Sequence, residues 1–295
     1  MAEGARKLVR QADQVLKGGF FSCLAGTRRF EEASEIYLQA ANQFKLAKEW
    51  QEAANCYTQI AYCAQKTGSQ TEEANNLMEA GNVLKKISTT QAVEQYEQAV
   101  GIFSAEGRFQ QCGKLLLTVA ELYEGEQLDH KEAKSYYKRA AEMFELDDHG
   151  KSNLSKCNLK FAQFAAKDGE LQEAIRIFEN EGEKALQNSL TQYGAKEHFL
   201  CAGLLHLASG DTVTVNLAVE KYFSLDPRFA GSREGELFAG LAKAFESSDV
   251  DAFVDRLSDY DSITKLDPWK TEILVRVKDS MQPSLDCAAG EVDLS

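Results

Sequence analysis

Proline is almost absent from this 295-residue chain, and its distribution constrains the fold more than any other feature of the sequence. The three prolines are Pro227, Pro268 and Pro283. Proline cannot donate a backbone hydrogen bond, and its ring blocks the interior of a helix. A chain whose first proline is residue 227 can form helix after helix over most of its length, so we expect an all-α protein.

A short pattern recurs along the first half of the chain: an alanine, a residue four positions later that is usually aromatic, and a residue seven positions later that is usually small. Offsets of four and seven place side chains on one face of a helix, so each copy predicts one helix with one packing stripe. The alanines of the clear copies are Ala33, Ala53, Ala74, Ala92, Ala133 and Ala174. With weaker copies near residues 113–120 and 154–161, the step is about 20 residues.

Helices at this spacing predict a tetratricopeptide-like fold. Each helix of about 17 residues is about 25 Å long, and a pair gives a repeat of about 40 residues, longer than the tetratricopeptide unit. Helical pairs bury their faces by stacking into a twisted sheet of helices with a long concave surface. Beyond the repeat, helical patterning continues through 195–209, 212–224, 232–247, 249–258 and 267–282. We therefore expect antiparallel hairpins over 1–183 and a C-terminal helical bundle over 184–295.

Composition excludes several classes of function. The net charge of −13 argues against nucleic-acid binding, which needs dense Lys and Arg. No run approaches the roughly 20 apolar residues of a spanning helix, and the N-terminus lacks the apolar core of a signal peptide, so we expect a cytoplasmic protein. Seven scattered cysteines and four histidines show no metal-ligand spacing. We expect no metal, no cofactor and no catalytic set, and hence not an enzyme.

Charge is distributed unevenly along the chain. Residues 1–30 carry six basic and two acidic side chains, residues 206–267 carry six basic and twelve acidic, and residues 279–295 carry four acidic and no basic ones. One interpretation is that the two ends meet different partners. The alternative is an ordinary solvated acidic surface.

The segment that follows the first predicted helix has an unusual composition. It combines several glycines with Phe20, Phe21 and Leu24, and Lys and Arg residues flank it. Adjacent aromatic residues cannot both enter a core from one helical face. Exposed rings beside cations suit the membrane–water interface, where the rings insert and the cations meet anionic headgroups. The alternative is that the segment folds onto the first hairpin.

Seven segments together resemble a known family. They are Phe-Phe-Ser at 20–22, the stretch 32–50, Glu-Ala-Gly-Asn at 79–82, Gly-Arg-Phe at 107–109, the stretch 120–124, the stretch 260–269 and Asp-Leu at 293–294. In this order and at this spacing, they resemble the soluble NSF attachment proteins of the alpha type over essentially the whole chain. NSF is the N-ethylmaleimide-sensitive factor, a hexameric ATPase of membrane traffic.

The resemblance implies an adaptor without an active site. Family members bind the four-helix bundle of syntaxin-like and other SNAREs that remains after membrane fusion. They recruit NSF and stimulate its ATPase so that the bundle is disassembled, while they contact the membrane peripherally from the cytosol. A general tetratricopeptide-like scaffold for other clients is the alternative.

The resemblance also assigns residues by position. Those matching the basic SNARE-binding positions are Lys48, Lys85, Arg108, Lys114, Lys156 and Lys160. Those matching the membrane-contacting loop are Phe20 and Phe21, to which we add Leu24. Those matching the NSF-binding positions are Asp211, Glu246 and the penultimate Leu294. Lys243 and Ser247 replace acids of that patch, for which Asp249, Asp251 and Asp255 are expected to compensate, and Ala25 stands where familiar members carry an aromatic residue.

Overall fold

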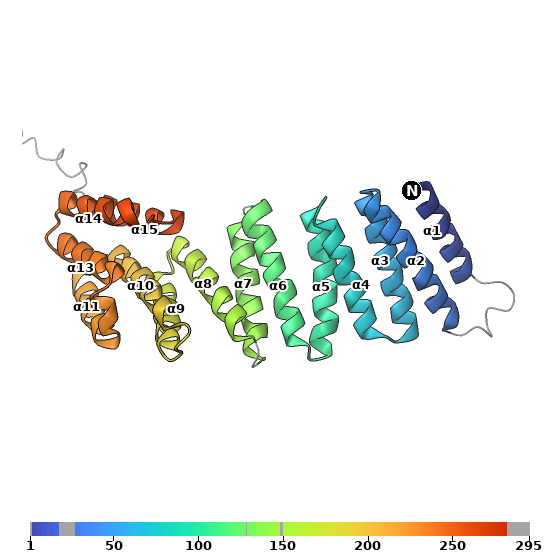
Figure 1. The fold of residues 1–295 in the computed structure, drawn as a ribbon, viewed down its shortest axis with the longest axis horizontal. Coiled ribbons are helices and arrows are strands. Elements are labelled where there is room, and N and C mark those ends of the chain that lie inside the picture. The colour runs from blue at the N-terminus through green and yellow to red at the C-terminus, as the bar shows by residue number, and fades with distance from the viewer. Residues whose placement is uncertain (1, 18–26, 128, 148–149, 282–295) are drawn as a thin grey trace, which may run out of the picture. The chain divides into compact units, whose positions relative to one another are not determined.

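The computed structural model describes residues 2–17, 27–127, 129–147 and 150–281 (Figure 1). Within these ranges the chain forms fifteen α-helices, one turn of π-helix and one 3₁₀ turn, with no strand. The predicted all-α class is confirmed: apolar residues at helical spacing give each helix one face to bury, and the long proline-free stretches leave the helical hydrogen bonds uninterrupted.

The chain divides into two compact units, residues 1–157 (unit 1) and 158–295 (unit 2). The division falls inside α8 (Lys151–Lys167). The boundary at 183/184 that the fading repeat predicts stays a prediction.

Unit 1 is a series of helices in which each, from α1 to α7, packs against the next (Figure 1). Its helices are α1 (Ala2–Lys17), α2 (Arg28–Leu46), α3 (Trp50–Thr67), α4 (Gln70–Leu84), α5 (Thr89–Ala105), α6 (Phe109–Leu122), α7 (His130–Glu145) and the start of α8. The repeat copies near 113–120 and at Ala133 imply a break between α6 and α7, but the form of this break was not expected from the sequence. There the chain leaves the α-helix through a π-helical turn, Tyr123–Gln127.

The repeated stripe forms the core of the helical series. All six alanines of the pattern are fully buried at 0% exposure. The aromatic residues four positions later are also buried, among them Tyr37, Tyr96 and Tyr137. The interpretation of the stripe as core is therefore confirmed, and the exposed faces and turns remain for binding.

Small residues in the stripe let consecutive helices approach until a ring covers the backbone. A Cβ added to Gly81 of α4 would lie 2.6 Å from the Tyr96 ring of α5, and one added to Gly113 of α6 would lie 2.7 Å from the Phe144 ring of α7. The Tyr96 hydroxyl then donates to Asn82 Oδ1 at 2.9 Å, back onto the preceding helix. Burial raises the pKa of Tyr96 to about 12, so it remains a neutral donor.

Ion pairs join alternate helices and define two layers. Arg139 of α7 donates two hydrogen bonds to the Glu97 carboxylate of α5, at 2.5 and 2.9 Å. The hydrogen bonds from Arg139 lower the pKa of Glu97 despite its burial. Lys156 of α8 pairs with Glu121 of α6 at 2.6 Å. These contacts place α7 beside α5 and α8 beside α6, the arrangement expected of two layers in which odd-numbered and even-numbered helices alternate.

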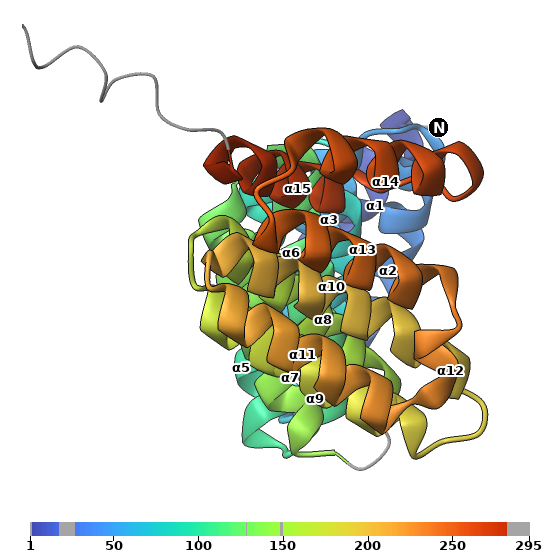
Figure 2. The same ribbon diagram turned by 90° about the vertical axis from the view of Figure 1, so that its left-hand side faces the viewer.

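Unit 2 continues with helices from the rest of α8 to α15. They are α9 (Leu171–Leu186), α10 (Ala195–Ser209), α11 (Thr212–Leu225), α12 (Pro227–Ala230), α13 (Arg233–Glu246), α14 (Val250–Ile263) and α15 (Pro268–Met281), with a 3₁₀ turn at Gln192–Gly194. The predicted C-terminal segments match these helices, except that α14 runs to Ile263 rather than 258. α14 and α15 lie along one side of the unit, next to α13 and α10 (Figure 2).

Polar contacts fix the helices of unit 2 to one another. Trp269 of α15 donates its indole N–H to the Gln163 carbonyl of α8 at 3.0 Å. Glu179 of α9 accepts from Lys221 and from the Tyr222 hydroxyl of α11, each at 2.8 Å. Burial raises the pKa of Glu179, but these donors and the nearby His206 outweigh it and hold the pKa at about 2.

The close approach at Gly81 makes a stability prediction. Gly81→Ala should lower the free energy of unfolding by about 1–3 kcal/mol, because the new methyl group overlaps the Tyr96 ring. Gly101→Ala is the matched control, since a Cβ there meets nothing within 4 Å on the same type of helix. It should raise stability by about 0.5–1 kcal/mol. Urea unfolding followed by circular dichroism measures both, and a Gly81 variant as stable as the control would contradict the packing.

Candidate protein-binding surfaces

The six basic residues that the sequence singles out all belong to even-numbered helices or to their ends. Lys48 follows α2, Lys85 follows α4, Arg108 precedes α6, Lys114 lies on α6, and Lys156 and Lys160 lie one turn apart on α8. The expectation that Arg108 opens the helix carrying Lys114 is confirmed, since Arg108 is the N-cap residue of α6. In unit 1 these residues therefore share one layer.

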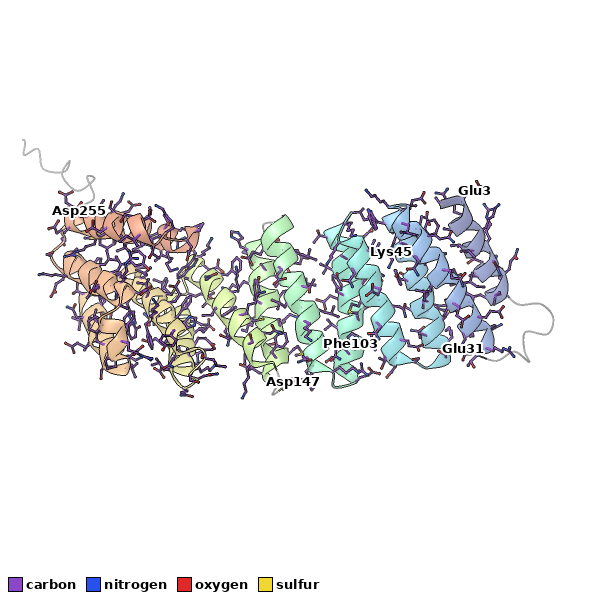
Figure 3. All side chains as sticks on the ribbon, viewed as in Figure 1. Glu3, Glu31, Lys45, Phe103, Asp147 and Asp255 are labelled. Atoms are coloured by element: carbon purple, nitrogen blue, oxygen red, sulfur yellow. The ribbon has the colours of Figure 1, made fainter. Side chains whose placement is uncertain are left out.

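The residues of this set that lie in unit 1 do not form a single patch. Figure 3 labels Glu3 and Lys45 at one end of the unit 1 helices, and Glu31, Phe103 and Asp147 at the opposite end. Lys48 and Lys85 lie at the end marked by Lys45, because both follow the C-termini of even-numbered helices. Arg108 lies at the end marked by Phe103. The cations are thus spread along the length of a helix, about 20 Å.

The charges differ in how far other side chains already neutralise them. Lys156 is paired with Glu121 at 2.6 Å, and Arg108 with Glu106 at 3.3 Å. Lys114 is exposed and makes only a long contact of 3.5 Å with Gln110. Lys48, Lys85 and Lys114 form no ion pair with any residue that the structure describes. Within this set of six, these three lysines therefore present charge that no described carboxylate neutralises.

Lys48 occupies a backbone position that other turns give to glycine. Its φ is 59°, in the left-handed region, whereas the corresponding turns after α3 and α5 use Gly68 (φ 78°) and Gly107 (φ 71°). A side chain in this region is disfavoured by contact between its Cβ and the backbone. A lysine kept at such a position is consistent with a role for its ammonium group outside the fold.

The predicted acidic residues gather at one end of unit 2. Glu246 ends α13, Asp249 caps α14 by accepting from Ala252 N at 2.9 Å, and Asp251 lies in the first turn of α14. Asp211 is the N-cap residue of α11 and lies just beyond the C-terminus of α10. Because α10, α11 and α13 are successive antiparallel neighbours, the C-terminal ends of α10 and α13 lie at the same end of the unit (Figure 2). All four carboxylates are exposed.

The remaining predicted residues, Phe20, Phe21, Leu24 and Leu294, lie outside the described residues.

Exposed apolar side chains are a feature that sequence reasoning missed. Leu190 is 88% exposed and Tyr193 is 72% exposed, both in the connection between α9 and α10. The signal in the sequence is one leucine among polar residues in a segment without helical patterning. Apolar groups at such exposure are typical of contact surfaces when they lie close together.

No helix in the described part of the chain is long and apolar enough to cross a membrane.

Comparisons with known proteins converge on one family. A family model described as "Soluble NSF attachment protein, SNAP" matches residues 3–282. The alpha-soluble NSF attachment protein of Vitis vinifera is 39% identical over 86% of this chain and 87% of its own length. The beta protein of Bos taurus is 37% identical over 96% and 92%, and the alpha protein of Homo sapiens is 37% identical over 94% and 95%. These relatives are named as attachment proteins, which agrees with the expectation of a non-enzymatic adaptor.

The left-handed conformation of Lys48 predicts the effect of one substitution on stability. Lys48→Gly should raise the free energy of unfolding by about 1 kcal/mol, because glycine adopts this φ without a Cβ contact. Gly107→Ala is the matched opposite change in the turn after α5, and it should lower stability by a similar amount. Urea unfolding of both variants tests the assignment, which fails if Lys48→Gly is less stable than the unsubstituted protein.

Proposed function

Because the chain belongs to the soluble NSF attachment protein family, we propose that it is the adaptor that presents assembled SNARE bundles to NSF. In this proposal it binds the bundle, recruits the ATPase and stimulates it, so that the bundle is disassembled for further rounds of vesicle fusion. The observation that carries the proposal is the presence of unneutralised lysines on one layer of unit 1 in a chain whose net charge is −13.

The bundle is proposed to lie along the even-numbered helices of unit 1. Lys48, Lys85 and Lys114 supply charges that no described carboxylate neutralises, and their spread over the length of a helix suits a rod-shaped partner better than a small acidic ligand. Such surface charges steer the encounter and fix the register of two proteins without large individual energies. Lys156 and Lys160 on α8 are proposed to extend the same contact.

Glu121 is proposed to tune this contact. Its carboxylate neutralises Lys156 and lies on the same face of α6 as Lys114, seven residues away. An acidic partner must therefore approach a glutamate as well as two lysines. Binding that is reversible and sensitive to salt follows from this arrangement, as a protein that must release its partner after disassembly requires.

NSF is proposed to bind the acidic end of unit 2. Asp211, Glu246, Asp249 and Asp251 lie together there, and the chain leaves α15 at the same end (Figure 2). Leu294 is proposed to act on the ATPase itself, as the penultimate residue of the tail. In this proposal the four acidic residues attract NSF and fix its position on the surface, and Leu294 adds an apolar contact with the ATPase.

A weak membrane contact is proposed for the segment with Phe20, Phe21 and Leu24. α1, which precedes this segment, exposes Lys7, Arg10 and Lys17. Cations beside inserted rings are attracted to anionic headgroups, and one small wedge gives only reversible binding.

Charge reversal at Lys114 tests the proposed SNARE surface. Lys114→Glu should weaken binding to a soluble SNARE bundle about three- to tenfold at low salt, with a smaller loss at high salt. Lys138→Glu is the matched control, because Lys138 is an exposed lysine on α7, in the other layer. It changes the net charge equally and should leave binding nearly unchanged.

A third variant in the same experiment should have the opposite effect on the affinity for the bundle. Glu121→Gln should strengthen binding, because it removes a repulsive carboxylate and releases Lys156. Titration of labelled bundle at two salt concentrations measures all three affinities. Equal losses in the Lys114 and Lys138 variants would show that net charge, and not this layer, governs the interaction.

Removal of the Leu294 side chain tests whether bundle binding and ATPase stimulation depend on different parts of the chain. Leu294→Ala should cut the stimulation of NSF phosphate release while bundle binding stays nearly unchanged, because the proposed SNARE surface includes no residue of the tail. Val292→Ala removes a similar apolar side chain two residues earlier and serves as the control. A Leu294 variant that loses bundle binding and ATPase stimulation to the same degree would refute this role.

A further inference from the structure

An apolar groove with a volume of 440 Å³ lies between α14 and α15 in unit 2. Its walls are formed mainly by Val254 and Leu257 of α14 and by Leu274 and Val275 of α15. Val254 is 43% exposed and Val275 is 46% exposed, so the groove presents aliphatic surface to water. Covering such surface is favourable, by about 25 cal/mol for each Å² removed from water.

The two ends of the groove differ in charge. Lys278 lines one end and Asp261 lines the opposite end. Asp261 is neutralised by Lys265 at 2.6 Å, and hydrogen bonds from Lys265 and from the Leu266 N–H lower its pKa. Lys278 forms no ion pair with another residue in the described ranges. The groove therefore suits a segment that carries an aliphatic side chain and, close to Lys278, a carboxylate.

The chain itself continues from the end of the groove where Lys278 lies. α14 and α15 are joined by a short connection and run in opposite directions, so the C-terminus of α15 lies beside the Val254 end of α14 (Figure 2). Residues 282–295 follow Met281, and they include Pro283, Leu285 and Asp286. Four extended residues span up to about 14 Å. Val275 lies about 9 Å back along α15 from Met281, which is within that reach.

We propose that this groove binds the chain's own C-terminal tail, with Leu285 between Val254 and Val275 and with Asp286 against Lys278. Closing a loop of four residues costs less entropy than bringing back the last residues of the tail. Glu291 and Asp293 flank the more distal aliphatic residues, and a deeper position would bring them toward Asp261. Docking at Leu285 leaves Leu294 free and fixes the start of the tail at the acidic end of unit 2. This inference does not depend on the proposed function.

A disulfide trap tests the proposal in the full-length chain. Ser258 is exposed and lines the groove one turn beyond Val254, where Cys287 would lie if Leu285 is docked. Ser258→Cys, in a Cys23→Ser background, should form an intramolecular disulfide with Cys287 under mild oxidation. The cysteines at 56, 63, 112, 157 and 201 are buried and should not compete.

Matched variants distinguish docking in the groove from chance encounters, which occur because the tail belongs to the same chain. Asp259→Cys places the thiol on the next residue of α14, which lines a different cavity facing α13, and it should react much more slowly. Lys278→Glu should slow the Ser258→Cys reaction about two- to fivefold, the range expected for loss of an exposed ion pair. Adding Asp286→Lys to that variant should restore the rate. Leu285→Ala should slow the reaction without charge change.

Several results would overturn the proposal. Equal rates for the Ser258→Cys and Asp259→Cys variants would mean that the tail samples the surface without docking. A rate insensitive to Leu285→Ala would remove the assigned contact. Disulfide-linked dimers that increase with protein concentration would assign the groove to a second copy of the chain. Absence of any crosslink would refute docking of the tail.

Discussion

The contact on which the rest of the structure depends is the one between an aromatic ring and a small residue of a preceding helix. Gly81 under Tyr96 and Gly113 under Phe144 set it in unit 1, and Gly182 under Phe199 repeats it in unit 2. A side chain at any of these glycines would push the helices apart. Because the ring needs a small residue beneath it, the alanine, aromatic and small positions must recur on one face of each helix, and consecutive helices pack at a fixed separation.

This use of one face per helix determines where binding can occur. The residues of the stripe are buried in the core, so charged residues lie on the outward faces of the helices and in the turns. Lys114 projects from an outward face, and Lys48 from a turn position that the turns after α3 and α5 give to glycine. Ion pairs between alternate helices, such as Arg139 with Glu97, hold the layers in register. The scaffold thereby presents charges at spacings set by helix length and helix separation.

The fold could be predicted because its signal is local and repeated: the buried stripes and most helix boundaries follow from residue offsets within single helices. The π-helical turn at 123–127 could not, because single turns of π-helix are rare and have no strong residue signature. The sequence also could not predict which lysines form ion pairs. Lys114 and Lys156 look alike in sequence, yet Glu121 neutralises Lys156 from a helix 35 residues earlier in the chain. Exposure of Leu190 likewise depends on how a connection lies on the folded helices.

The central claim is that this chain couples NSF to SNARE bundles, and reconstitution tests it most directly. A fluorescently labelled four-helix SNARE bundle is mixed with NSF and ATP, with and without the protein, and loss of bundle is followed over time together with phosphate release. The account predicts rapid disassembly only when the protein and ATP are both present, with phosphate release that rises as the bundle is engaged. Disassembly no faster than in the adaptor-free control would contradict it.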